Sequence, residues 1–159
     1  MTIRPFTGAD VPAMTTIWND VVKADDAFPQ SDPMDQSEAN AFFHSQSLTA
    51  VADDQGEIVG LYILHPNGIG HLGKNANASY AVRSDRRGTH VGEALVMDSL
   101  TQAKALGFRN LQFNAVLASN APALHLYAKL GFHSLGILKD GYLHTDGSWE
   151  DLRLFSHPL

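Results

Sequence analysis

The chain has 159 residues, of which 44% are hydrophobic and 18% charged, so a single globular domain over residues 1–159 is expected and disorder is not. It contains no cysteine, which excludes disulfides, thiolate metal sites and cysteine nucleophiles. The net charge of −6 argues against a nucleic-acid partner, because neutralisation of phosphates dominates that kind of binding. No secretory signal opens the chain and no stretch reaches the roughly 18 apolar residues of a membrane span, so we expect a cytoplasmic protein with no membrane partner.

The first part of the chain predicts one strand, two helices and a strand hairpin. Asp10 is placed to cap a helix whose first turn holds Pro12, and Trp18 is one of the apolar residues that follow at helical spacing. The connector at 53–56, with its glycine, predicts a hairpin. In chain order we expect a strand at 2–6, a helix from Val11, a loop at 28–35, a helix at 37–47, and strands at 48–52 and 57–65.

The second part of the chain alternates helices with strands. Gly107 and Gly131 are each placed to end a helix. The order indicates a mixed α/β domain with antiparallel hairpins early and βαβ units in its second half. We expect a loop at 66–77, a strand at 78–82, a helix at 89–106, a strand at 110–117, a helix at 121–130, and strands at 132–138 and 149–155.

The stretch RRGTHVGEAL, residues 86–95, could bind an anion. Three of the eleven basic residues of this acidic chain gather at Arg83, Arg86 and Arg87, just before a predicted helix start. Free N–H groups and the helix dipole attract phosphate there, and glycine permits its close approach. Because pairs of glycines are common in turns, this stretch alone supports a phosphate loop and an ordinary helix start equally.

Two motifs in order give a resemblance. Residues 87–92 fit Arg/Gln-x-x-Gly-x-Gly/Ala, except that His90 replaces the first motif glycine. Residues 120–132 fit Asn-x-x-Ala-x-x-x-Tyr-x-x-x-Gly-Phe. With both motifs at this spacing, the chain resembles the GCN5-related N-acetyltransferase (GNAT) family over nearly its whole length. The resemblance implies an α/β (α+β) fold with a mixed sheet of about seven strands, the parallel fourth and fifth strands splayed, and about four flanking helices.

The same resemblance implies acetyl-CoA, without a metal, in the V-shaped gap between the strands at 78–82 and 111–116. The backbone of Val82 would bind the pantetheine arm, and Asn120 would contact the pantetheine or phosphate region. Tyr127 would lie near the thioester sulfur as proton donor to the leaving thiolate. Helical spacing alone favours a packing role for Tyr127, and the pattern over residues 120–132 favours the acid role; Asn120 also suits a helix N-cap. The backbone amides implied for the pyrophosphate are those of Arg87, Gly88, Thr89, His90, Val91 and Gly92.

The acceptor is implied less directly. The stretches GHLGKNANASYAV and LQFNAVLASN resemble a subgroup that includes a yeast N-acetyltransferase of azetidine-2-carboxylate, in which Asn77 and Asn114 would serve the substrate. The acceptor would then be a small amine, an amino acid or a toxic analogue. Asn114 lies in an apolar run, where its amide needs partners. It either satisfies backbone groups exposed by the splay or, as a catalytic group, faces the acetyl group or the amine.

Several alternatives stay open at this point. The segment IWNDVV weakly resembles acetyltransferases of phosphinothricin, and a non-catalytic CoA sensor of the same fold is the other alternative. Trp18, Phe28 and Tyr142 could line the acceptor pocket or serve as core or surface aromatics. No base is identified: Glu38, Glu57, Glu93 and the eight histidines qualify by type only, and the histidines lack metal-motif spacing. A homodimer is possible.

His90 poses a question of its own. It must either take a negative φ or bear the cost of the left-handed region, which histidine tolerates better than most residues. Its ring also offers a donor that can become cationic near neutral pH, so it could bind cofactor phosphate or be a bystander.

Overall fold

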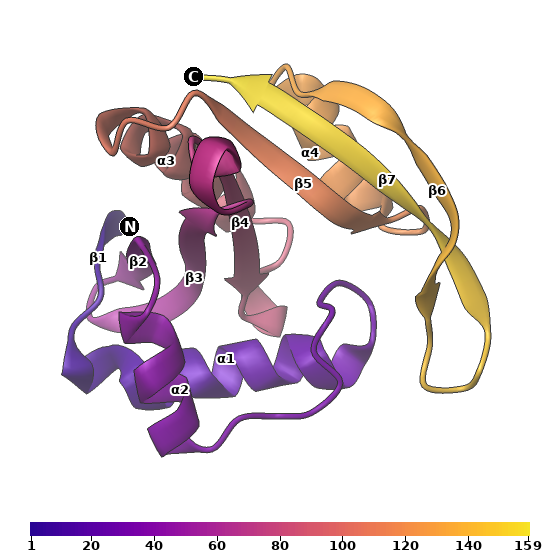
Figure 1. Ribbon diagram of the computed structural model, residues 1–159. Helices are drawn as coiled ribbons and strands as arrows, with labels where there is room; N and C mark the ends of the chain where they lie inside the picture. The colour runs from indigo at the N-terminus through magenta and orange to yellow at the C-terminus, as the bar shows by residue number, and fades with distance from the viewer.

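The computed structural model describes residues 1–159 and contains one mixed seven-stranded sheet. The strand order is β1-β2-β3-β4-β5-β7-β6, and all neighbours are antiparallel except β4 and β5 (Figure 1). This agrees with the implied α/β fold. The strands are β1 (Thr2–Pro5), β2 (Leu48–Asp54), β3 (Glu57–Pro66), β4 (Asn75–Val82), β5 (Asn110–Leu117), β6 (His133–Leu143) and β7 (Trp149–Pro158).

Four α-helices cover the two faces of the sheet. One face carries α1 (Val11–Ala24) and α2 (Gln36–His44), and the other carries α3 (Val91–Ala105) and α4 (Ala121–Lys129). Short 3-10 turns at Gly8–Asp10, Gly70–Leu72 and Ser84–Arg86 join these elements. None of the helices is both long and apolar enough to span a membrane.

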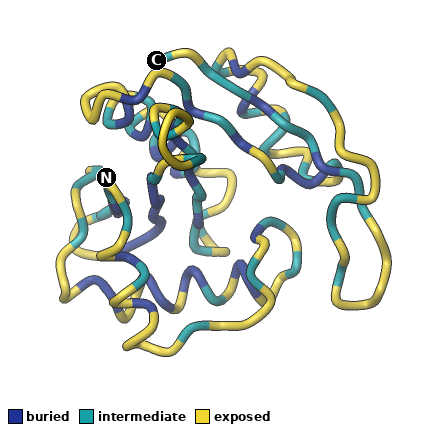
Figure 2. Tube along the Cα trace, in the orientation of Figure 1, coloured by how far each residue is buried: buried dark blue, intermediate teal, exposed yellow.

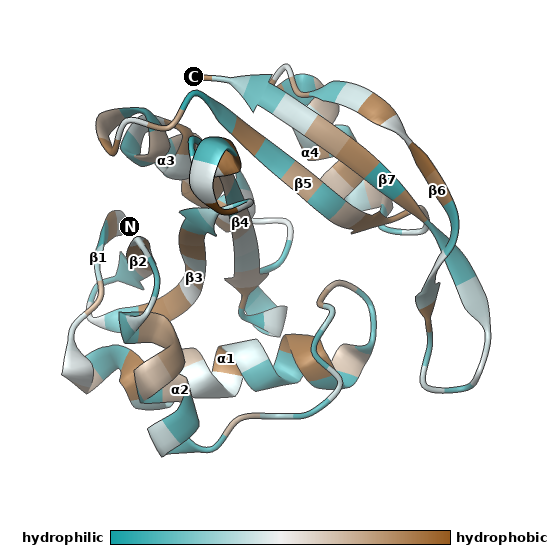
Figure 3. Ribbon diagram, in the orientation of Figure 1, coloured by the Kyte–Doolittle hydropathy of each residue, from teal (hydrophilic) through white to brown (hydrophobic).

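Period-two alternation along β3 builds two cores, one on each face. Leu61 and Ile63 pack with α1 and α2, whereas Tyr62 and Leu64 pack with α3. The central strands are therefore buried on both sides, as the dark blue segments of Figure 2 and the brown ones of Figure 3 show. Two cores around one sheet hold the central strands rigidly, and the candidate site is built on those strands.

The parallel pair β4 and β5 separates after two register positions. Asn75 pairs with Asn110 and Ala76 with Leu111, and no further pairing follows. The Asn110 side chain also donates to Asn75 Oδ1 at 2.9 Å, which closes the apex of the V. From Asn77 onward, the side of β4 that faces β5 has no strand partner. The splay implied by the resemblance is thus present.

The element order is as expected, but several bounds differ. The loop expected at 66–77 is shorter, because antiparallel pairing extends β3 to Pro66 and starts β4 at Asn75, which places Asn77 inside a strand. The expected helix at 89–106 starts at Val91, since His90 is left-handed. The last two strands are longer than expected, because β6 continues through a register shift between Leu138 and Tyr142. Backbone pairing between strands decides all these bounds except the helix start. The spacing of apolar side chains in the sequence does not report this pairing.

Candidate functional site

A cavity of about 1320 Å³ opens where β4 and β5 separate. It is walled by these two strands, the start of α3, helix α4 and the segment after α1. Of the predicted site residues, Thr89 and Val91 do not line it, and Val91 is instead buried in the core. The predicted residues that do line it are Asn77, Val82, Arg87, Gly88, His90, Gly92, Asn114, Asn120 and Tyr127.

The backbone before and at the start of α3 forms an anion cradle. The N–H groups from Gly88 to Glu93 donate to no acceptor within the protein. Gly88 has φ 76° and His90 has φ 65°, so left-handed residues alternate along the loop and turn successive N–H groups to one side. The positive end of the α3 dipole adds to this field. The arrangement can bind a phosphate or pyrophosphate.

His90 takes the left-handed conformation, which answers the conformational question that the sequence raised. Its side chain is 83% exposed, and its Nδ1 lies 3.2 Å from Glu93 Oε2. The backbone N–H of His90 belongs to the cradle whatever the ring does, since the N–H has no other partner.

The three glutamates considered as bases are occupied elsewhere. Glu38 completes the capping box of α2 with the Asp35 amide, at 2.9 Å. Glu57 pairs with Arg83 at 3.4 Å. Glu93 accepts from Lys129 Nζ at 2.6 Å, and this contact joins the start of α3 to α4. The pKa of Glu93 is lowered, first by Lys129 and then by His90. None of these carboxylates is a free base.

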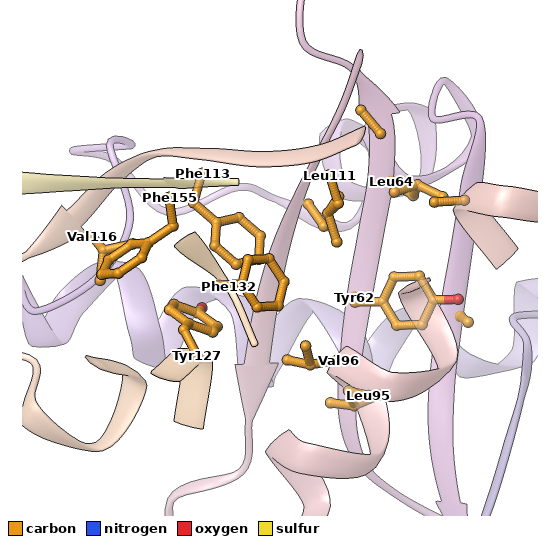
Figure 4. Close-up of a cluster of buried hydrophobic side chains, with 14 of the residues drawn as sticks. Tyr62, Leu64, Leu95, Val96, Leu111, Phe113, Val116, Tyr127, Phe132 and Phe155 are labelled. Carbon is orange, nitrogen blue, oxygen red and sulfur yellow. The ribbon is translucent and has the colours of Figure 1, made fainter. Parts of the chain in front are cut away.

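Tyr127 projects from α4 into an aromatic cluster (Figure 4). Its ring centroid lies 4.5 Å from that of Phe113 and 5.3 Å from that of Phe132. The hydroxyl has no hydrogen-bond partner within the protein, and Tyr127 lines the cavity. Burial raises the pKa of Tyr127 above that of an ordinary phenol, so the hydroxyl keeps its proton at neutral pH. A packed ring with an unpartnered O–H can donate into the cavity.

A cluster of amides bridges the splay on the face that carries α1 and α2. Asn67 Oδ1 accepts from Asn77 Nδ2 at 3.0 Å and from Asn114 Nδ2 at 2.6 Å. Gln112 Nε2 donates to Asn114 Oδ1 at 2.9 Å. Asn114 thus bonds to side chains, and of the two alternatives left open by the sequence, these contacts do not support a role in satisfying backbone groups exposed by the splay. Sequence analysis missed Asn67, because it lies in the stretch read as a glycine-rich loop.

The remaining candidates divide between site and scaffold. Asn120 accepts from the Ala123 amide at 3.2 Å and also lines the cavity, so it caps α4 within the site. Phe28 lines the cavity, whereas Trp18 is buried among aromatic rings. Tyr142 donates to Asp25 at 2.9 Å, outside the cavity lining. No group of three or more His, Cys, Asp or Glu side chains is arranged to hold a metal ion.

Curated relatives of the chain are N-acetyltransferases. It is 28% identical to the N-acetyltransferase aca1 of Schizosaccharomyces pombe over 69% of its length, a match that spans 53% of that relative. It is 27% identical to an L-methionine sulfoximine/L-methionine sulfone acetyltransferase of Pseudomonas aeruginosa, over 94% of this chain and 90% of the relative. It is 28% identical to the phosphinothricin N-acetyltransferase of Alcaligenes faecalis, over 99% and 82%.

Solved structures agree with these relatives. A GCN5-related N-acetyltransferase from Kribbella flavida superposes with a TM-score of 0.91 at 31% identity, over 99% of this chain and 97% of that one. A phosphinothricin acetyltransferase from Sinorhizobium meliloti in complex with AcCoA has the same fold, with a TM-score of 0.92 at 23% identity over 99% and 88%. The model of the acetyltransferase (GNAT) family matches residues 14–132. On these matches and the splayed sheet with its cradle, the chain belongs to the GNAT family of acyltransferases.

Proposed function

We propose that the protein transfers the acetyl group of acetyl-CoA to the amine of a small molecule, an amino acid or a toxic analogue, by direct attack on the thioester. The observation that carries this proposal is the row of unpartnered N–H groups from Gly88 to Glu93. The row lies at the mouth of a cavity that continues along β4 to Asn77 and Asn114.

Each part of the cofactor has a matching surface. The cradle suits the pyrophosphate. The side of β4 that faces β5 lacks a strand partner from Asn77 to Val82, so its backbone groups can bond to the amides of the pantetheine arm. A backbone N–H of the same edge can stabilise the oxyanion that develops at the thioester carbonyl, because it is already oriented.

The leaving group and the acceptor amine also have matching groups. The departing thiolate takes a proton from Tyr127, whose hydroxyl has no competing partner within the protein. Asn77 donates through Nδ2 to Asn67, which leaves its Oδ1 free to accept from an amine. No covalent intermediate is needed, in agreement with the absence of cysteine.

An amino-acid-like acceptor is supported by the curated relatives that match nearly the whole chain, which act on methionine sulfoximine and on phosphinothricin. We therefore propose acceptors of this class, with phosphinothricin itself as the alternative. A CoA sensor is the other alternative, and the unpartnered Tyr127 hydroxyl favours catalysis over it.

Release of the CoA thiol from acetyl-CoA, measured against a panel of amino acids, their sulfoximine and phosphinic analogues and amine antibiotics, tests the proposal. We expect turnover on at least one amino-acid-like amine. Thermal denaturation with acetyl-CoA at about 100 times its Kd should show roughly 2.7 kcal/mol of added stability. Stabilisation without turnover on any amine would favour the sensor, and the absence of stabilisation would refute the cofactor assignment.

A further inference from the structure

His65 lies beside the acceptor end of the cavity. It is the penultimate residue of β3 and stands directly opposite Asn77 in the antiparallel register, so the two side chains share the face that carries α1 and α2. Both residues line the cavity, and His65 is half-buried. Strand β4 contains no aspartate or glutamate, and the one acidic residue of β3 is Glu57, at the opposite end of that strand from His65.

The hydrogen bonding of His65 fixes which ring nitrogen carries the proton. Nδ1 lies 2.9 Å from the carbonyl oxygen of Pro66. A carbonyl oxygen can only accept, so Nδ1 is the donor, and in the neutral ring Nε2 keeps its lone pair. No group of the protein bonds to Nε2. The protein therefore holds an imidazole with a free basic nitrogen at the cavity.

No charged side chain lies beside His65 on its face of the sheet. The neighbours on its face of the sheet are the uncharged Ile63, Asn77 and Ser79, and Asn114 follows across the splay. Tyr80 belongs to the core of the opposite face, where its hydroxyl donates to Ser99 Oγ, since Ser99 donates to the Val96 carbonyl. The other titratable groups of the cavity come from α3, α4 and the segments before α2 and α3: Asp26, Arg86, Arg87, His90, Glu93, His125, Tyr127 and Lys129.

We propose that His65 is the general base of the acetyl transfer, a residue role that rests on the proposed function. Nε2 of His65 takes one proton from the acceptor ammonium, and the resulting neutral amine attacks the thioester carbon. The C–N bond forms and the C–S bond breaks. Tyr127 gives its proton to the departing thiolate and regains one from the nitrogen of the new amide, and His65 returns the first proton to solvent, so each turnover releases one proton.

The test compares His65→Gln with a matched control, His157→Gln. The Nδ1 of His157 also bonds to the carbonyl of a following proline, Pro158, but His157 lies outside the cavity. Steady-state thiol release is measured from pH 5.5 to 9 with the best acceptor, and acetyl-CoA affinity is measured by calorimetry. For His65→Gln we expect kcat/KM at pH 7 to fall about 100-fold, the lower range for loss of a general base, with acetyl-CoA affinity unchanged.

The pH profile separates a base from a merely structural residue. In the parent, kcat/KM should rise by less than tenfold per pH unit, because His65 can take the proton of an acceptor that arrives as an ammonium. In His65→Gln it should keep rising tenfold per pH unit, because only amine that arrives neutral can react, and His157→Gln should retain the parent profile. A parent-like profile in His65→Gln overturns the base assignment alone. A parent protein that binds acetyl-CoA and acetylates no amine overturns the proposed function, and this assignment with it.

Discussion

At the scale of single residues, Tyr127 is the side chain to which the proposed function assigns the proton of the leaving thiol. Its ring is fixed by Phe113 and Phe132, so its hydroxyl is held in one place. Burial raises the pKa of Tyr127, which keeps the proton on the phenol at neutral pH, so in the proposed reaction this proton is available to the departing thiolate. In the proposed function, packing and proton donation thus come from the same side chain.

Tyr127→Phe should lower kcat by about 100-fold while changing acetyl-CoA affinity little, because the ring is retained and only the proton donor is lost. Stopped-flow acetyl transfer and calorimetry measure the two effects separately. Tyr142→Phe, which removes a hydroxyl outside the cavity, is the control. Equal kcat in Tyr127→Phe and the parent would remove the acid role.

His90 adopts a left-handed backbone conformation that is unfavourable for a residue with a side chain. A residue with a Cβ at φ 65° is disfavoured by about 1 kcal/mol, yet the cradle needs this conformation to turn its N–H groups together. The glycine usual at this motif position has no such cost.

His90→Gly should therefore raise the melting temperature by roughly 2–4 °C, whereas His90→Val should lower it, since a β-branched residue is worse at positive φ. Thermal denaturation checks both variants. Acetyl-CoA affinity in the glycine variant should be less dependent on pH between about 6 and 8, because that variant lacks an ionisable ring. A parent affinity that does not vary over this range would make the ring a bystander.

At the scale of elements, the splay forms the candidate site and is also a weakness of the sheet. Strands β4 and β5 share two register positions, and beyond them Asn67 joins the two strands through Asn77 and Asn114. Asn67 does not line the cavity, so it is a positioning residue that sets the orientation of two amides that do.

Asn67→Ala should raise KM for the acceptor amine severalfold, leave acetyl-CoA affinity unchanged, and cost about 1 kcal/mol of stability through its lost hydrogen bonds. Steady-state kinetics and denaturant unfolding measure these effects. Asn75→Ala loses a bond between the same strands at the closed apex, so it should cost similar stability without a change in KM. An unchanged KM in both variants would remove Asn67 from the acceptor site.

The hairpin of β6 and β7 is joined to the end of α1 by a charged cluster. His144 lies 2.8 Å from Glu150 and 3.4 Å from Asp25, and the Thr145 amide donates to Asp25 at 2.8 Å. Glu150 and Asp25 raise the pKa of His144. The pKa of Asp25 is lowered, first by the Thr145 amide and then by Tyr142. Burial would raise the pKa of Glu150, but the Ser119 amide and His144 outweigh it and the net direction is down.

These pKa shifts predict that the contact between the β6–β7 hairpin and α1 is most stable over a limited pH range. A raised histidine pKa contributes stability at low pH that is lost as pH rises through the folded value, and lowered carboxyl pKa values contribute stability that is lost as pH falls through theirs. Protection of residues 143–149 from hydrogen exchange should therefore be greatest in mildly acidic solution, after correction for intrinsic rates. His144→Gln should remove the decrease toward alkaline pH, and His133→Gln, at the start of β6, should not. Equal pH dependence in both variants would contradict this role.

For the molecule as a whole, the order of elements could be read from the chain, because each helix and strand carries its own periodicity, caps and glycine stops. The cradle could be located as well, since the RRGTHVGEAL stretch joins a basic cluster, glycines and a helix start. Such features are local, and their physical causes lie within a few residues of one another.

What only the tertiary structure decided is which side chains meet across the splay. Asn67, Asn77 and Asn114 come from three separate segments, and no local pattern reports that β4 and β5 part after Ala76. The same holds for His65, whose place opposite Asn77 depends on strand register. Sequence alone determined the family resemblance, the fold and the cofactor loop, because these depend on local motifs. The acceptor end depends on contacts between segments distant in the chain, so only folding brings it together.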